Sequence, residues 1–407
     1  MTDLYYPLRS LKGNNWFKLI CGASFQHLPA VRNLTLAYTL AGADCIDVAA
    51  DPAVVAAAQE ALKVATSMVA EAQQRGFGFQ ALPWLMVSLN DGEDPHFRKA
   101  EFSQTECPID CLRPCEKICP AQAIIFHRRD DDFSGVVPES CYGCGRCLPI
   151  CPSQLIYTRS YISTPEAIAS VLSTRVDAVE IHTQVGRLSE FKRLWQAIAP
   201  WVDQLKLVAI SCPDGDGMID YLWSLHDLIS PLPCPLIWQT DGRPMSGDIG
   251  DGTTLAAVKL GQKVLAARLP GYVQLAGGTN SYTVAKLQAA GLLNDFRLPI
   301  LDFGLKSASE KSKVVDYQER SNNPKSKSLV GEYKRSTQNP KSYIAGVAYG
   351  SYARVLLSPI LNQLEQMEIN TVNPMPTAHL EDEPELLWQA VALAHSLVSQ
   401  LKSLAKR

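Results

Sequence analysis

Eight of the twelve cysteines in this 407-residue chain lie between residues 107 and 151. A secreted disulfide scaffold is short and rich in cysteine throughout, whereas this chain is rich in cysteine in one stretch only. The N-terminus also lacks the basic start and apolar run of a signal peptide, so we expect a cytoplasmic protein in a reducing compartment. In such a compartment, crowded thiols favour metal or cluster binding over disulfide formation.

The second half of this stretch has the spacing C-x2-C-x2-C-x3-C-P, formed by Cys141, Cys144, Cys147 and Cys151 before Pro152. Two-cluster bacterial ferredoxins use this run: three closely spaced thiolates bind one [4Fe–4S] cluster, and the fourth cysteine binds the other. Zinc is the alternative, because C-x2-C pairs also build zinc ribbons. However, a zinc ion does not require three thiolates within seven residues followed by C-P.

A second motif is required by this crosswise rule, and it is present as C-x3-C-x3-C-x3-C-P before Pro120, with two gaps one residue longer than usual. One cluster is then expected on Cys119, Cys141, Cys144 and Cys147. The other is expected on Cys107, Cys111, Cys115 and Cys151. The segments that follow the two motifs, 121–124 and 153–156, each resemble a turn leading to a strand, which predicts a pseudo-twofold ferredoxin-like fold.

The elements around the cysteine stretch alternate between short apolar runs and helical patterns. Strands are predicted over residues 16–21, 45–49, 84–89, 178–182, 205–211, 236–240, 272–276 and 344–349. Helices are predicted over residues 52–74, from 165 onward, and over 188–198, 218–228, 255–267, 283–289 and 386–406. Continuous apolar strands separated by helices predict a parallel sheet covered on both faces. Eight such units favour an α/β fold of the (β/α)8, TIM-like barrel type over an open doubly wound sheet with fewer strands.

The cysteine stretch follows the third predicted strand, so it interrupts the barrel as a ferredoxin-like α+β insertion with two [4Fe–4S] clusters. We expect the first part of the barrel at 1–95, the ferredoxin-like domain at 96–160 and the second part of the barrel at 161–305. A basic flexible loop at 306–342 and a last strand with C-terminal helices at 343–407 complete the chain. The four remaining cysteines, Cys21, Cys45, Cys212 and Cys234, are interpreted as packing residues.

An insertion after a barrel strand emerges at the face where barrel active sites form. Polar residues expected to line this mouth are Ser24, Asp47, Asn90, His182, Ser211, Asp241, Thr279 and Ser351. Glycine-bearing turns follow the last two strands, and Gly277, Gly278, Gly350 and Ser351 are candidates for holding a phosphate, such as that of a flavin. The alternative is that these glycines only satisfy the geometry of tight turns.

Net charge of −3 argues against chain-wide attraction to nucleic acid or a membrane, and no apolar stretch is long enough for a transmembrane segment. Residues 306–341 nevertheless carry +5 while the rest of the chain carries −8. Such a segment is a solvated loop, a docking segment for an acidic partner or a contact for nucleic acid, and the negative charge of the rest of the chain opposes the last of these.

Beyond these patterns, the segment 11–24, the cysteine stretch and the region containing 275–280 together resemble the light-dependent period A family of cyanobacterial iron–sulfur proteins. The resemblance covers nearly the whole chain. It implies a redox sensor of the circadian input pathway that reports the photosynthetic redox state to the clock. It also implies sensor kinases of the clock input complex as protein partners, with ferredoxin or a quinone as redox donor.

Because kinase, phosphoacceptor and chromophore motifs are missing from the sequence, any signal must pass through cluster state and partner contact. This favours a redox sensor or electron carrier over an enzyme. The alternative is a barrel oxidoreductase in which the two clusters pass electrons to a flavin or substrate at the barrel mouth. A third reading is a plain electron-transfer module in a larger complex.

Overall fold

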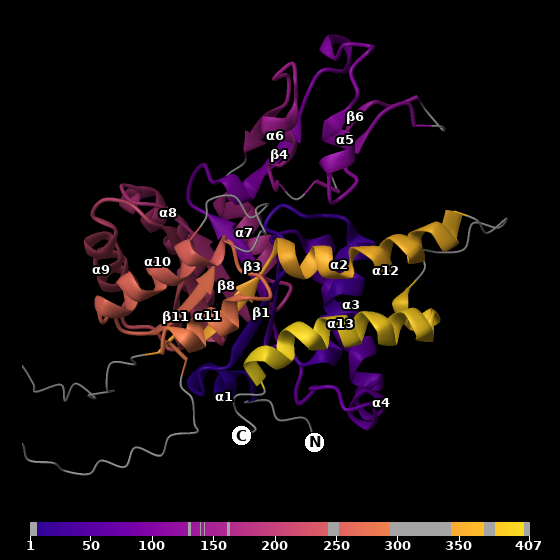
Figure 1. Cartoon of the computed structure of the whole chain (residues 1–407). Coiled ribbons are helices and arrows are strands. Elements are labelled where there is room, and N and C mark those ends of the chain that lie inside the picture. Colours follow the sequence, from indigo (N-terminus) through magenta and orange to yellow (C-terminus); the bar gives the residue numbers. More distant parts are fainter. Residues whose placement is uncertain are drawn as a thin grey trace, which may run out of the picture.

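The computed structural model describes residues 6–128, 132–138, 140–141, 143–160, 163–242, 252–293, 343–369 and 379–402. Eight parallel strands form a closed barrel in the spatial order β1-β12-β11-β10-β9-β8-β3-β2 (Figure 1). Their bounds are β1 (Trp16–Ile20), β2 (Cys45–Ala49), β3 (Trp84–Asn90), β8 (Ala178–His182), β9 (Leu207–Pro213), β10 (Leu236–Asp241), β11 (Tyr272–Ala276) and β12 (Gly346–Tyr349). This confirms the predicted barrel and rules out the open sheet.

Closure of the barrel depends on a close approach between its first and last strands. Gly346 of β12 lies opposite Trp16 of β1, and a Cβ atom on Gly346 would lie 2.1 Å from the Trp16 carbonyl oxygen. Only glycine therefore fits at this position without moving the two strands apart.

Each barrel strand is followed in sequence by a covering helix, directly or, after β3, beyond the insertion. These helices are α2 (Leu28–Ala41), α3 (Pro52–Ser67), α7 (Pro165–Leu172), α8 (Leu188–Ile198), α9 (Met218–Ile229), α10 (Thr254–Ala266), α11 (Thr283–Ala289) and α12 (Ser351–Ile369). Asp51 caps α3 by accepting hydrogen bonds from the N–H groups of Ala53 at 2.8 Å and Val54 at 3.3 Å. The prediction of a single helix over 52–74 is wrong, because helix α3 ends before Met68 and a second helix, α4 (Val69–Gln74), follows it.

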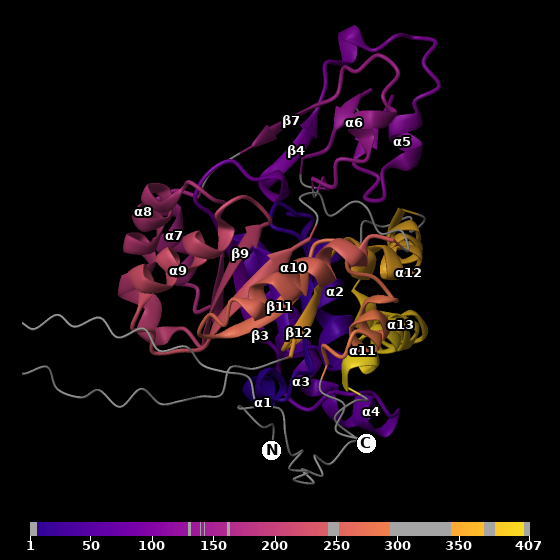
Figure 2. The same cartoon turned by 60° about the vertical axis from the view of Figure 1, so that its left-hand side comes forward.

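The cysteine-bearing segment leaves the barrel after β3 and returns before α7. It contains β4 (Arg98–Glu101), α5 (Pro114–Ile118), β5 (Ile124–Ile125), β6 (Gly135–Val136), α6 (Cys147–Ile150) and β7 (Tyr157–Ser160), with short 3-10 turns η1 (Pro95–Phe97) and η2 (Gln104–Glu106). Strands β4 and β7 pair antiparallel and rise side by side from the barrel (Figure 2). At their base, the Asn90 Oδ1 atom accepts hydrogen bonds from the Ser163 N–H at 2.8 Å and Oγ at 2.9 Å, which joins the two ends of the excursion.

The barrel interior has an apolar lower half and a charged upper half. Its lower half is a cluster closed by Leu11 of α1 (Tyr6–Lys12) and contains Trp16, Cys45, Trp84, Met86, Ala178, Leu207, Ala209, Ile237 and Ala345. Inward-facing residues alternate along each strand, so the next layer toward the mouth holds Lys18, Asp47 and Glu180, all buried. The polar layer therefore lies directly below the face where barrel proteins bind ligands.

The predicted C-terminal helix is observed as α13 (Pro384–Lys402), which packs against α2 and α12; residues 403–407 lie outside the described residues. The expected basic loop 306–342 also lies outside them. In the part of the chain that the structure describes, no helix has both the length and the apolar character needed to span a bilayer.

Replacing Lys18 with methionine should destabilise the fold by roughly 3–5 kcal/mol, because Asp47 and Glu180 then lose the counter-charge that compensates their burial. Lys206→Met is the matched control: Lys206 pairs with Asp177 at 2.6 Å but its side chain is 50% exposed, so the loss should stay below about 1 kcal/mol. Anaerobic urea unfolding of both variants measures the difference. Equal losses would show that the buried pair is not a main determinant of stability.

Candidate functional site

Four of the predicted cluster ligands, Cys107, Cys111, Cys115 and Cys151, form one group in space. Cys107 interacts electrostatically with Cys111 and Cys151, and Cys115 interacts with Cys107 and Cys151. Cys151 thus lies with the three cysteines of the first motif, although in sequence it belongs to the second.

The second group is formed in the same crosswise way. Cys144 interacts with Cys119 and Cys141, and Cys147 interacts with all three. These four cysteines line one cavity together with Gly143, Gly145, the polar residues Arg146 and Thr158, and a set of apolar residues, namely Ala100, Ala121, Ala123, Ile124, Val136 and Leu148. The cavity wall thus offers four sulfur donors among mostly apolar residues, which is the donor chemistry that an iron–sulfur cluster needs.

Backbone N–H groups point at several of these sulfur atoms. The Ala123 N–H donates to the Cys119 Sγ at 3.2 Å, and the Ala100 N–H donates to the Cys141 Sγ at 3.4 Å. The Arg113 N–H donates to the Cys111 Sγ at 3.4 Å in the first group. Hydrogen bonds of this kind stabilise electron-rich sulfur and raise cluster potentials.

The two motifs also share their local backbone. Gln122 and Gln154, each three residues after the last cysteine of its motif, have left-handed φ values of 48° and 50°. Their N–H groups bond back to the carbonyls of Cys119 at 3.2 Å and Cys151 at 3.1 Å. The matching turns agree with the pseudo-twofold relationship that the two C-P-x-Q segments predict.

Burial and neighbouring cysteines raise the pKa of the Cys147 thiol to about 12, and the pKa of Cys144 is raised in the same way. Four thiolates are therefore unfavourable in this cavity without a compensating positive charge. The iron ions of a cluster supply that charge, since a coordinating thiol is deprotonated outright. The donor set thus fits an iron–sulfur cluster.

The two groups differ in their surroundings. Cys144 and neighbouring Ala121 pack against the main hydrophobic core of the barrel, so the second group lies on the barrel side of the insertion. The loop of the first group is open to solvent, where Ile109 is 96% and Leu112 is 84% exposed. We call these the inner and outer cysteine groups.

The barrel mouth contains a pocket that combines predicted and unpredicted residues. Its predicted lining residues are His182, Asp241, Gly277, Gly278, Thr279, Gly350 and Ser351. Residues that the sequence analysis did not select are Ile20, Gly22, Ala23, Ser88, His96, Glu180, Gln239, Tyr352 and Arg354. Both Gly277 and Gly278 have positive φ values, 63° and 96°, so turn geometry alone already favours glycine at these two positions.

Four residues expected at the mouth lie outside this pocket lining. Asn90 closes the base of the insertion, Asp47 accepts hydrogen bonds from Ser88 at 2.9 and 3.0 Å, and Ser211 donates to Asp241. Ser24 is fully buried. Of the eight residues expected at the mouth, only His182, Asp241, Thr279 and Ser351 line the pocket.

Lys18 is the centre of a buried charge network beneath the pocket. Its ammonium group contacts Glu180 and lies 3.3 Å from Asp47. Burial opposes the charged form, but the two carboxylates hold the pKa of Lys18 above its usual value. Gln239 donates to the Glu180 Oε1 at 2.6 Å and accepts from Gln274 at 2.6 Å, which extends the polar layer across the barrel interior.

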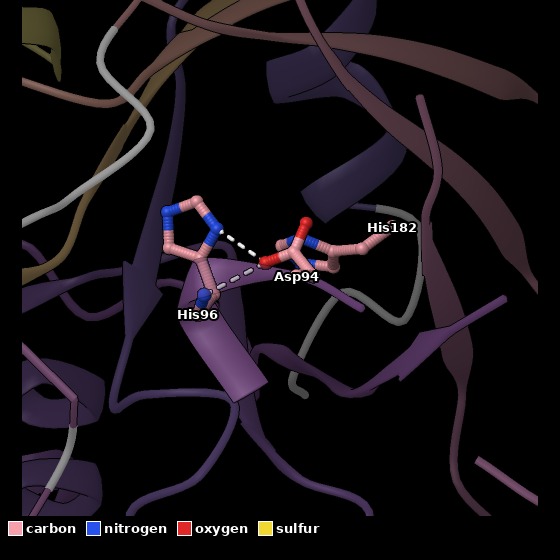
Figure 3. Close-up of side chains that lie close together, drawn as sticks. All are labelled: Asp94, His96 and His182. Atoms are coloured by element: carbon pink, nitrogen blue, oxygen red, sulfur yellow. Dashed lines mark hydrogen bonds and ion pairs between the residues drawn. The ribbon is translucent and has the colours of Figure 1, made fainter. Parts of the chain in front are cut away.

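From Glu180 the network continues to the mouth through two histidines. The His182 Nε2 atom lies 2.9 Å from the Glu180 Oε1, and its Nδ1 lies 3.8 Å from the Asp94 Oδ2. The Asp94 Oδ1 lies 2.9 Å from the His96 Nδ1 and accepts the His96 N–H at 2.7 Å, so the carboxylate stands between the two imidazoles (Figure 3).

Sequence reasoning missed Lys18 and Glu180 because they interrupt otherwise apolar strand runs. Alternation was the available signal: Lys18 follows Trp16 by two residues, and Glu180 precedes His182 by two, so each pair shares one face of its strand. Asp94 and His96 precede the cysteine motifs, and nothing in their spacing marked them.

The scattered cysteines behave as the packing interpretation expects. Cys21, Cys45 and Cys212 are buried, and burial raises the pKa of both Cys21 and Cys212 to about 12. Cys234 is half-buried, and its pKa is raised to about 11 for the same reason. Their thiols therefore stay protonated and unreactive at neutral pH.

Comparison with known proteins identifies the cysteine-bearing segment. Residues 107–162 match the family model described as the LdpA Fe–S cluster-binding domain. Together with the closed barrel, this match defines the class: a barrel protein that carries an iron–sulfur cluster-binding domain.

The rest of the chain gives the family. Residues 170–400 match the light dependent period A C-terminal domain. A curated relative from Synechococcus elongatus, "Light dependent period A", is 44% identical over 398 residues, which are 98% of this chain and 94% of the relative. The chain belongs to the light-dependent period A family. A solved structure of the Escherichia coli homocysteine methyltransferase MmuM in its apo form is 15% identical, covering 66% of this chain and 92% of that chain at a TM-score of 0.29.

In metal-free protein, His182 should stay protonated until about pH 9. Burial lowers its pKa, but the hydrogen bond to Glu180 and the charge of Asp94 outweigh burial and raise the pKa to about 9. NMR titration of isotope-labelled histidines, with His182 assigned from His182→Gln, measures the midpoint, and Glu180→Gln should lower it. A midpoint at or below the ordinary value of about 6.5 would contradict this network.

Proposed function

We propose that the chain binds two [4Fe–4S] clusters, one on Cys107, Cys111, Cys115 and Cys151 and one on Cys119, Cys141, Cys144 and Cys147. The observation that carries the proposal is the crosswise grouping of these thiols in space. Residues 96–160 form the cluster-binding unit, inserted between 1–95 and 161–305. Zinc would explain neither the exchange of the fourth cysteine between motifs nor the matching turns that follow both of them.

The function that this site supports best is redox sensing. The clusters take up or lose electrons according to the photosynthetic redox state, and the change is relayed to the circadian clock through partner binding. Family membership supports the link to light-dependent period control. Sensor kinases of the clock input complex are the proposed partners, and ferredoxin or a quinone is the proposed redox donor, in the cytoplasm.

The outer cysteine group is the part of the insertion suited to such a relay. Its loop exposes Ile109 and Leu112 beside Cys107 and Cys111, so loss or oxidation of the cluster alters an apolar surface next to solvent. A partner must bind the two states with different affinity for this change to carry a signal. Segment 306–342, with its excess of basic residues, is proposed as a second contact for an acidic partner.

Paired cysteine substitutions test the ligand sets. Cys119→Ser with Cys144→Ser should remove one cluster and leave about four irons per chain, because both residues serve the inner cluster. Cys119→Ser with Cys151→Ser should remove both clusters, although it also changes only two cysteines. Iron and sulfide analysis after anaerobic purification distinguishes them. Equal iron contents in the two double variants would contradict crosswise ligation, and Cys234→Ser serves as the control.

Partner affinity should depend on cluster state. We expect the purified clock-input kinase of the same organism to bind the oxidised, reduced and apo forms with dissociation constants that differ at least about tenfold. Ile109→Asp with Leu112→Asp should weaken the favoured complex by a similar factor without changing iron content. Leu255→Asp, at a position 56% exposed on α10, is the matched control. Equal affinity for all three forms would refute the sensor function.

A barrel oxidoreductase is the second candidate, in which the clusters pass electrons to a flavin or substrate at the barrel mouth. The pocket lined by Gly277, Gly278, Gly350 and Ser351 favours it, because Ser351 begins α12 and Arg354 lies one turn further on. Backbone N–H groups and positive charge at a helix start suit a phosphate. Flavin that stays bound after anaerobic purification and is lost in Gly278→Val would favour this candidate over a sensor. A plain electron-transfer module, in contrast, would be reduced reversibly without any change in its affinity for partners.

A further inference from the structure

Asp94, His96 and His182 bring three metal-ligating side chains to one point at the barrel mouth. One ligand atom from each residue lies within 4.8 Å of the other two. None of the three belongs to the cysteine motifs, and the proposed clusters do not need them. Two imidazoles and one carboxylate form a donor set that proteins use for divalent transition metals such as zinc and iron.

His182 is already prepared for coordination by its neighbours. Its ring is 6% exposed, and its Nε2 atom lies 2.9 Å from the Glu180 Oε1. A carboxylate at Nε2 holds a ring proton on that side, so Nδ1 is the nitrogen that gives up its proton and coordinates a metal. Among the described residues, this buried Nδ1 atom has no hydrogen-bond partner, and it faces the Asp94 carboxylate at 3.8 Å.

The surroundings hold Glu180 firmly in this role. Lys18 and Gln239 bind the same carboxylate from inside the barrel, so Glu180 is fixed on three sides. Carboxylate–histidine–metal arrangements depend on such outer partners for ligand orientation and basicity.

The three donors also lie where a bound metal would be accessible to a ligand. Asp94 and His96 follow β3 and His182 ends β8, two neighbouring strands of the barrel, at its carboxyl-terminal face. His96 and His182 line the mouth pocket together with Ser88 and Asp241. Coordination positions not filled by protein would therefore open into this pocket, as in metal sites that keep water or substrate ligands.

We propose that Asp94, His96 and His182 bind one divalent transition-metal ion at the barrel mouth, separate from the iron–sulfur clusters. Binding requires each coordinating nitrogen to be free of its proton, and it replaces direct Asp94–histidine contacts with metal–ligand bonds. The inference does not depend on the proposed redox sensing, because it rests on residues outside both cysteine groups.

Zinc is the probe for the test, because Zn²⁺ is redox-inactive and its amount is measured independently of the iron in the clusters. Full-length protein with intact clusters is equilibrated anaerobically with buffered Zn²⁺, and zinc and iron are both counted by mass spectrometry. We expect about one zinc per chain in the unchanged protein, and at least about tenfold weaker binding in Asp94→Asn, His96→Gln and His182→Gln. His226→Gln is the control, because His226 also lies beside a carboxylate, 3.5 Å from Asp227, but on α9 away from the pocket.

Iron content and the thermal midpoint of each variant without added zinc show whether it folds and keeps its clusters, so the failure of this site is distinguishable from failure of the cluster proposal. X-ray absorption at the zinc edge identifies the ligands: nitrogen and oxygen at about 2.0–2.1 Å support the site, whereas sulfur at about 2.3 Å would assign the zinc to cysteines. Unchanged zinc affinity in the three folded variants, or no zinc bound by the unchanged protein, would overturn the proposal.

Discussion

The insertion is organised by one constraint: each group of four thiols takes three members from one cysteine motif and the fourth from the other. Cys119 must reach Cys141, Cys144 and Cys147, and Cys151 must reach the motif that begins at Cys107. The chain can satisfy both requirements only by folding back on itself between them. The antiparallel pairing of β4 with β7 and the Asn90–Ser163 hydrogen bonds then return the chain to the barrel close to where it left.

The same constraint places the two cysteine groups in different surroundings, one near the barrel and one near solvent. One cysteine group packs against the barrel core, while the other lies beside the exposed side chains of Ile109 and Leu112. In the proposed function, a redox change at the outer group takes place close to a surface that a partner can contact, and one at the inner group takes place close to the barrel. The barrel itself contains a charged layer around Lys18 and Glu180, and Glu180 connects this layer to the histidines at the mouth. The barrel therefore carries polar groups of its own.

Sequence patterns predicted the barrel well because its strands are buried on both faces and are nearly continuous in apolar residues. They singled out the eight crowded cysteines as cluster ligands because iron–sulfur coordination requires fixed spacing within a short segment, and this ligand assignment stays a prediction. The helix α2 was not predicted, although Pro29 in its first turn and a left-handed Gly42 at its end are recognisable helix boundaries. Lys18, Glu180, Asp94 and His96 could not be grouped from sequence, because only closure of the barrel brings strands β1, β3 and β8 to one centre.

The proposed relay requires that the eight crowded thiols hold two [4Fe–4S] clusters. Iron and sulfide analysis of anaerobically purified protein, combined with EPR of the reduced state, tests it most directly. We expect about eight irons and eight sulfides per chain, with a spectrum broadened by magnetic interaction between two neighbouring reduced clusters. About four irons with the spectrum of an isolated cluster, or zinc in place of iron at the cysteines, would contradict it.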